Sequence, residues 1–214
     1  VGTALAWPVP RLYWGTMADI AVPASTLEVA AVQRALGAEG LDGWLLYDFH
    51  GLNPIALDVT GVGRQGGHLA TRRWYYLVPA QGEPRKLVHA IESETLAHLP
   101  GTTERYAGRT ALEAGLKRML ETLRKGGAAP RVAMEYSPGC AIPYVSRVDA
   151  GTIELVRQFG VDIVSSADLV QRFAAVWRDA EIHTHNAASL KLYRIKDRAF
   201  EAIARRMRDG VATT

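Results

Sequence analysis

The sequence contains one cysteine and no apolar run long enough to cross a membrane. Because Cys140 has no second cysteine to pair with, no intrachain disulfide can form, and a reducing cytoplasm is the simplest compartment. No apolar stretch approaches the ~18–20 residues that a membrane span requires. The first residues also lack the basic region and apolar core of a signal peptide. We therefore expect a cytoplasmic protein that makes no contact with a membrane.

A strong charge of one sign is also absent. Lysine and arginine number 25 against 22 acidic residues, which gives a formal net charge of +3. A dedicated nucleic-acid binder would carry its basic residues in a stripe, so we expect no nucleic-acid partner. The hydrophobic content of 48% is ordinary for a globular protein. A chain of 214 residues can form one well-buried domain with an appendage, or two small domains.

Two apolar runs between residues 72 and 92 predict a β-hairpin. Trp74–Val78 is aromatic and β-branched and ends at Pro79, which is typical of a buried strand. Gln81-Gly82 provides a turn, and Leu87–Ile91 is the second apolar run.

Strand and helix patterns alternate along the chain. The strands that we expect besides the hairpin are Gly43–Tyr47, Arg131–Tyr136 and Val161–Val164. The expected helices begin at the capping-box pairs Ser25/Glu28 and Thr110/Glu113, at Gly151, and at Ser165 with Asp168. This alternation predicts an α/β fold, namely a three-layer α/β/α domain with a mixed, partly parallel sheet.

The segment after the first expected strand, Asp48–Pro54, is polar and loop-like. In open α/β sheets, ligands bind outside the carboxyl ends of the strands, so this loop is a candidate binding element. The glycines of the following segment do not form a phosphate-binding fingerprint, because Gly61-x-Gly63 lacks a correctly spaced third glycine.

Several separated blocks resemble one known family. They are TGVGRQGGHLATRRWYYLVPAQGEPRKLVHAIE at residues 60–92, MEYSP at Met134–Pro138 and IPYVSRVDAGTIELVRQFGVDIVSSADLVQRF at Ile142–Phe173. In this order they resemble the N-terminal domain of the creatinase, prolidase and aminopeptidase P family, whose catalytic domain has the pita-bread fold. The resemblance runs from about Leu27 to the last residue and implies a creatinase N-terminal-like domain.

The resemblance also implies a division of the chain. Residues 1–16 are expected to be a non-native or disordered N-terminal extension, and residues 17–176 the α/β domain. Residues 177–214 are expected to be a linker and the first helix of a truncated catalytic domain. The pattern of Asp179–Asp209 predicts that helix, with basic residues between its apolar positions. A solvated polar face explains these charges better than contact with a membrane or nucleic acid.

The activity that the resemblance implies belongs to an intact enzyme. That enzyme hydrolyses Xaa-Pro peptide bonds with two divalent metal ions, of manganese, cobalt or zinc. The family's metal ligands are two Asp, one His and two Glu of the catalytic domain, which the resemblance places beyond Thr214. We therefore assign no catalytic and no metal-binding residue in this chain and expect the chain alone to be inactive. The implied partners are its own catalytic domain, a second subunit in a homodimer, and a proline-containing peptide.

The resemblance implies a role in substrate binding for one region. In these dimers the N-terminal domain covers the catalytic mouth of the neighbouring subunit. An arginine can hold a peptide carboxylate through two hydrogen bonds, and an aromatic ring can wall off a proline. The candidate contacts in trans are Arg64, His68, Arg72 and Trp74, with His50 and Asn53 behind them. The alternative is that these residues only shape the dimer interface.

Other chemistries have weaker support. His183-x-His185 is a poor metal pair on a helix, because residues two apart point to different sides. Cys140 lies in a segment rich in proline and glycine with no histidine assigned as its partner, which favours an inert thiol. Glu92 and Glu94 are paired in sequence only.

Two readings of function remain open at this stage. The first is the N-terminal part of a Xaa-Pro peptidase, where the choice between prolidase, aminopeptidase P and creatinase activity lies outside this chain. The second is a stand-alone peptide- or protein-binding module of the same fold. A role in homodimerisation alone is compatible with both.

Overall fold

The computed structural model describes residues 27–63, 70–177 and 179–210. The helices in these ranges are α1 (Val29–Ala38), α2 (Pro54–Thr60), α3 (Arg109–Glu121), α4 (Ala150–Gln158), α5 (Ala167–Phe173) and α6 (Asp179–Arg208). The strands are β1 (Gly43–Asp48), β2 (Trp74–Pro79), β3 (Arg85–His89), β4 (Thr102–Tyr106), β5 (Arg131–Met134) and β6 (Asp162–Ser165). Short 3₁₀ turns occupy Ala90–Glu92, Pro138–Cys140 and Pro143–Val145.

The strands form one mixed sheet in the order β4-β3-β2-β1-β5-β6. β2 is antiparallel to both of its neighbours, and Tyr75 lies opposite Leu87 in the predicted hairpin. The pairs β1·β5, β5·β6 and β3·β4 are parallel. The predicted mixed, partly parallel sheet is therefore confirmed.

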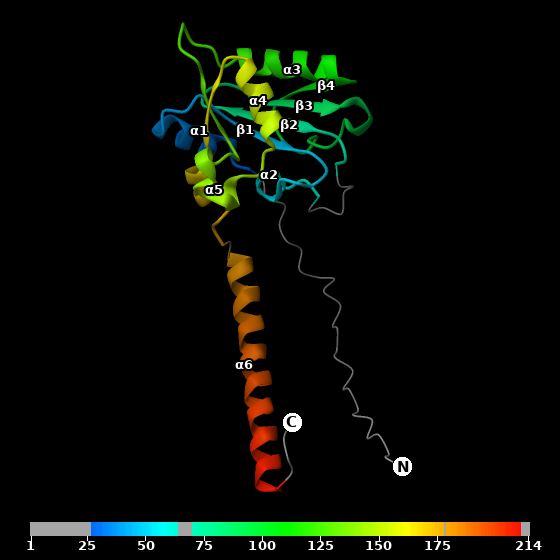
Figure 1. Ribbon diagram of the computed structural model, residues 1–214, viewed down its shortest axis with the longest axis vertical. Coiled ribbons are helices and arrows are strands. Elements are labelled where there is room, and N and C mark those ends of the chain that lie inside the picture. Colours follow the sequence, from blue (N-terminus) through cyan, green and yellow to red (C-terminus); the bar gives the residue numbers. More distant parts are fainter. Residues whose placement is uncertain (1–26, 64–69, 178, 211–214) are drawn as a thin grey trace.

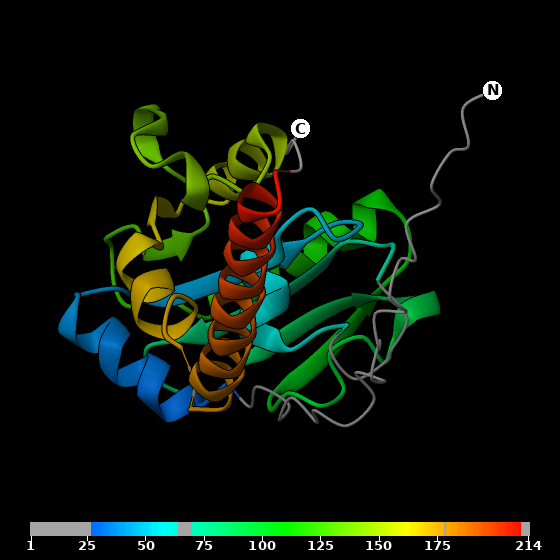
Figure 2. The same cartoon turned by 90° about the horizontal axis from the view of Figure 1, so that it is seen from below.

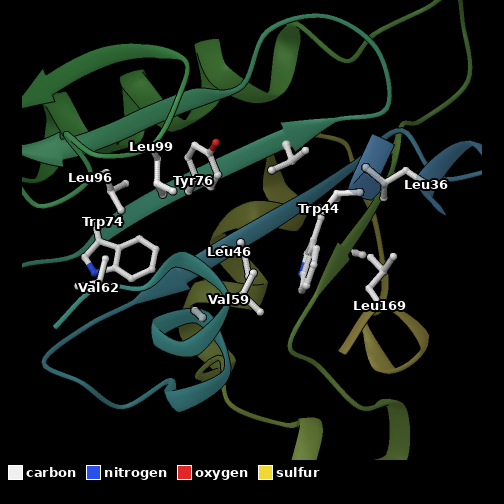
Figure 3. Packing of buried hydrophobic residues seen from close by; sticks show 14 of the residues in the cluster. Leu36, Trp44, Leu46, Val59, Val62, Trp74, Tyr76, Leu96, Leu99 and Leu169 are labelled. Carbon is white, nitrogen blue, oxygen red and sulfur yellow. The ribbon is translucent and has the colours of Figure 1, made fainter. Parts of the chain in front are cut away.

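Residues that alternate along β1 point to opposite faces of the sheet, as the strand period of two requires. Trp44 and Leu46 belong to a buried cluster with α1, α2 and α5 (Figure 3), whereas Leu45 and Tyr47 belong to a second cluster with α3 and α4. Each large side chain that is fully removed from water contributes roughly 1.5–3 kcal/mol, so the two clusters supply most of the driving force for folding. Helices on both faces of the sheet confirm the predicted three-layer α/β/α architecture (Figure 1).

The predicted helix starts need correction. The N-cap of α1 is Glu28 and makes no side-chain hydrogen bond, while Ser25 lies outside the described residues. The N-cap of α3 is Gly108, at φ 79°, so Thr110 is the second residue of the helix and not its cap. A left-handed glycine turns the chain directly from β4 into α3, and this backbone solution replaces the expected side-chain cap.

Two elements have no counterpart among the predicted ones. β4 is a polar strand at the edge of the sheet, so it lacks the apolar run that marks a buried strand. α2 has only seven residues, too few for a clear helical period, and it begins with Pro54 in its first turn.

The long C-terminal helix is confirmed as α6, which spans 30 residues and buries none of them. Figure 1 shows α6 running away from the α/β body, and in the view from below in Figure 2 it stands in front of the sheet. Its exposed apolar side chains include Tyr193, Phe200 and Met207, which are spaced by seven residues and so share one face. Among the described residues, no helix has the length and apolar character of a membrane span.

Candidate functional site

A buried polar network lies where the parallel strands β1, β5 and β6 end. Its members are Asp48, Asn53, Glu135 and Ser166, none with more than 1% of its surface exposed. Polar groups removed from water are stable only when their hydrogen bonds are satisfied, so such a cluster fixes local structure closely. The network surrounds the start of α2 and the loop from Phe49 to Asn53 that connects β1 to it.

The Asp48 carboxylate folds this loop back on itself. Its Oδ2 accepts a hydrogen bond of 3.0 Å from the amide of Gly51, and its Oδ1 accepts one of 2.8 Å from the amide of Asn53. The enclosed residue His50 has a φ of 61°, in the left-handed region that non-glycine residues seldom adopt. The loop therefore holds His50 in a strained backbone conformation.

The Asn53 side chain anchors the other end of the loop. Its Oδ1 accepts from the amide of Ala56 at 3.1 Å, which caps α2. Its Nδ2 donates to the carbonyl of Tyr47 at 2.7 Å and to Glu135 Oε2 at 2.8 Å. The side chain thus ties the helix start to both β1 and the end of β5.

Glu135 is the acceptor at the centre of the network. Its Oε1 accepts from Trp44 Nε1 at 2.8 Å and from the Ser166 hydroxyl at 3.2 Å, and its Oε2 accepts from Asn53. Complete burial raises the pKa of Glu135 above its ordinary value, and the three donated hydrogen bonds partly oppose that rise. Sequence reasoning missed this residue, although a glutamate directly after the apolar run Val-Ala-Met was a visible signal.

His50 is exposed at the tip of the braced loop, with its ring edge-on to Phe49 at a centroid distance of 5.6 Å. Asp48 lies opposite Trp74 in the antiparallel pairing of β1 and β2. The chain after Asp48 and the chain before Trp74 therefore leave the same edge of the sheet. This register brings the predicted residues His50 and Arg72 to one edge.

Arg72 is exposed, and its backbone is held by Glu92. The Glu92 carboxylate accepts from the amides of Thr71 and Arg72 and from the Thr71 hydroxyl, at distances of 2.5–3.2 Å. Partial burial of Glu92 opposes ionisation, but these donors outweigh it and lower the pKa of Glu92 below its ordinary value. The sequence analysis paired Glu92 only with Glu94, whereas its real partners lie 20 and 21 residues away.

Trp74 lies in the core with 1% of its surface exposed, near Val62 and Leu96 (Figure 3). A buried indole cannot reach a bound peptide without a rearrangement, so Trp74 does not belong to the accessible candidates. Asn53 is also buried and acts on the loop from behind it. Arg64 and His68 lie outside the described residues, which leaves His50 and Arg72 as the exposed candidates.

The described residues contain no group of three or more His, Cys, Asp or Glu side chains that could hold a metal ion. A metal site needs such a cluster, so no step of our account runs through a metal bound by these residues. His183 and His185 are both exposed, and the His185 ring contacts Trp177 edge-on at 4.6 Å. Cys140 is exposed in a 3₁₀ turn.

Two shallow grooves flank α2 on the side away from the sheet. One, of about 340 Å³, is lined by Ile55, Tyr144, Val170 and neighbouring residues and is mostly apolar. The other, of about 860 Å³, lies between the segment Ala174–Trp177 and the first turns of α6. Tyr144 is 81% exposed beside the first groove, so this end of the body presents aromatic surface to solvent.

Comparison with known proteins bears on the fold. No protein-family model matches the sequence. No curated protein matches it either. Solved structures do resemble the chain. A dipeptidase from Pyrococcus horikoshii is 20% identical over 82% of this chain and 43% of its own, with a TM-score of 0.53. A dipeptidase from Mycobacterium ulcerans is 17% identical over 79% of this chain and 42% of its own, with a TM-score of 0.54.

A proline dipeptidase from Streptococcus pneumoniae is 16% identical, over 70% of this chain and 98% of its own, with a TM-score of 0.51. The chain has the creatinase/prolidase N-terminal domain fold. This confirms the fold that the sequence resemblance implied. The chain spans about 43% of the length of the Pyrococcus dipeptidase, and identity at this level establishes a shared fold alone.

Proposed function

We propose that this chain is the N-terminal, non-catalytic part of a Xaa-Pro peptidase-like protein. In this role it supports dimerisation and presents the loop from Phe49 to Asn53 to the substrate pocket of a partner subunit. The intact protein hydrolyses the bond before proline with two divalent metal ions held outside the described residues. The observation that carries the proposal is an exposed, strained His50 on a loop whose two ends are fixed by buried hydrogen bonds.

This loop has the properties of a binding element and not of a flexible linker. Backbone strain persists only where the surroundings over-determine it, and it concentrates at functional sites. Asp48 and Asn53 provide that constraint from inside the core, and His50 stays in solvent. A side chain presented in this way loses little conformational entropy when it contacts a ligand.

The charges at this edge suit the terminal groups of a peptide. The Arg72 guanidinium, exposed at the edge where His50 lies, is a donor fork that matches a carboxylate. The Glu92 carboxylate fixes the Arg72 backbone without pairing with its side chain in any hydrogen bond of the described residues. The Arg72 guanidinium therefore stays available to a partner, apart from one 3.2 Å contact with Thr71.

The unpartnered face of α6 supports the link to a further domain. A solitary helix with Tyr193, Phe200 and Met207 exposed on one side normally buries that side against another element. In the proposed intact protein that element is the catalytic domain. The chain's coverage of less than half of the Pyrococcus dipeptidase is consistent with this arrangement.

The test is steady-state kinetics on an Xaa-Pro dipeptide with the intact enzyme. We expect His50→Ala and Arg72→Ala to raise KM on the order of tenfold with kcat little changed, because they remove uniform binding and not chemistry. Arg85→Ala, at an exposed arginine on β3, is the matched control and leaves KM unchanged. Unaltered KM in both candidate variants contradicts the proposal.

A stand-alone binding module is the second candidate, and the apolar groove beside Tyr144 favours it. Grooves with aromatic walls accept extended, proline-rich segments in many recognition modules. A proline-rich peptide that binds the chain alone, with binding lost in Tyr144→Ala and retained in His50→Ala, supports the module. The reverse pattern supports the peptidase role.

A further inference from the structure

We propose that the Glu135 carboxyl group is a positioning residue that fixes the loop from Phe49 to Asn53 and thereby the placement of His50. The structural part of this proposal stands on the hydrogen bonds of the described residues. Its consequence for substrate binding rests on the proposed function.

The position of Glu135 requires two acceptor oxygens. Trp44 Nε1 can only donate, and it donates to Oε1; Asn53 Nδ2 donates to Oε2. The Asn53 amide cannot be turned over, since its Oδ1 already accepts from Ala56 and its Nδ2 also donates to Tyr47. A glutamine has one acceptor oxygen, so in either orientation its NH₂ group would face a buried donor.

The backbone of Glu135 is held as firmly as its side chain. Its carbonyl accepts from the amides of Arg147 at 2.9 Å and Val148 at 3.0 Å. The Ser166 hydroxyl, at the start of α5, reaches the same carboxyl group. Glu135 therefore joins the ends of β1, β5 and β6 at one point and offers the loop a rigid anchor.

The anchor acts on His50 through Asn53. Asp48 fixes the start of the loop, and the pair Asn53–Glu135 fixes its end, so His50 lies between two fixed points. With the second point released, the strained φ of His50 has less to oppose its relaxation to a negative value. The exposed ring then samples other positions while the sheet beneath it stays intact.

The experiment compares Glu135→Gln with Glu154→Gln by amide hydrogen exchange on the chain itself. Glu154 is an exposed glutamate on α4, so the control removes the same charge without touching the network. We expect the amides of Gly51 and Asn53 to exchange on the order of tenfold faster in Glu135→Gln, with the amides of Tyr75 and Leu77 in β2 unchanged. Unchanged loop exchange, or an equal rise in loop and sheet, overturns the proposal.

Asn53→Ser keeps the inference testable if Glu135→Gln does not fold. Serine caps a helix about as well as asparagine but is too short to reach Glu135. The same selective rise in Gly51 exchange is expected, and its absence overturns the proposal. In a folded double variant, Asn53→Ser removes the donor that faces the new amide, so the two effects on unfolding combine to less than their sum.

A kinetic readout in the intact enzyme separates this inference from the proposed function. Glu135→Gln should raise KM as His50→Ala does, because both affect the same contact. If loop exchange rises but neither variant changes KM, the positioning role holds and the proposed substrate contact fails. If His50→Ala raises KM while loop exchange and KM are both unchanged in Glu135→Gln, the positioning role fails and the proposed function stands.

Discussion

The indole of Trp44 and the carboxyl group of Glu135 form a 2.8 Å hydrogen bond inside the core. Trp44 lies opposite Ala133 in the parallel pairing of β1 and β5, so Glu135 is two residues beyond the partner of Trp44 and points to the same face. An apolar layer thus ends in a polar one where the strands end. The position of this polar layer explains why the loop above it is ordered and why His50 tolerates a left-handed backbone.

The first prediction concerns the strain at His50. Replacing His50 with glycine should stabilise the chain by about 1 kcal/mol, since glycine adopts a φ of 61° without steric cost. Thermal unfolding measures the gain, expected as a rise in Tm of roughly 2–4 °C for a chain of this size. His50→Ala keeps the strain and is the control. A lower Tm for His50→Gly than for His50→Ala would show that the loop is not strained.

Glu92 gives a prediction about acid. Its pKa is lowered in the folded state, so its stabilising effect is complete above the ordinary glutamate pKa and is lost as pH falls through the folded value. Glu92→Gln should therefore lose about 1 kcal/mol near neutral pH, and the difference from the parent chain should vanish below about pH 4. Denaturant titrations at several pH values test this. Glu94→Gln, at an exposed neighbour, should show no such convergence.

The hydroxyl groups of two buried tyrosines predict opposite effects. Tyr75 Oη is buried and has no hydrogen-bond partner among the described residues, whereas Tyr106 Oη donates to the carbonyl of Arg73 at 2.7 Å. Removing an unsatisfied buried group relieves a desolvation cost, and removing a satisfied one loses about 1 kcal/mol. Tyr75→Phe should raise Tm and Tyr106→Phe should lower it. Equal losses in both variants would mean that Tyr75 has a partner.

Two helical glycines differ in the space around them. A Cβ at Gly115 in α3 would lie 2.8 Å from Leu87 Cδ1 and 2.9 Å from Glu104 Oε1, while a Cβ at Gly37 in α1 would meet nothing within 4 Å. Gly115→Ala should destabilise the chain by about 1 kcal/mol or more, because overpacking outweighs the gain in helix propensity. Gly37→Ala should stabilise it by up to about 1 kcal/mol. Urea unfolding of both variants checks the sign, and a stable Gly115→Ala would mean that α3 stands further from β3.

Elements with a strong apolar period were predictable from sequence. β1 and β2 are buried along their whole length, and α1 buries Val32, Ala35 and Leu36 at helical spacing, so each carries its signal in its own residues. β4 and α2 carry no such signal, since one is a polar edge strand and the other is short. Their positions follow from pairing with β3 and from the Asn53 cap, which are properties of the fold.

The candidate site was predictable only in part. The loop after β1 was identified because loops at the carboxyl ends of parallel strands bind ligands, and His50 was named with it. Glu135 and Glu92 act through partners 82 and 20 residues away, and no local pattern connects residues so far apart. Trp74 was named for its aromatic ring, but the same property places it in the core.

The central claim is that this chain serves catalysis without performing it. The most direct measurement is hydrolysis of an Xaa-Pro dipeptide in the presence of Mn²⁺ or Co²⁺. It compares the chain alone with the chain joined to the catalytic segment of the proposed intact enzyme. We predict no activity for the chain alone and metal-dependent activity for the joined protein. Activity in the chain alone, or none in either, would contradict the account.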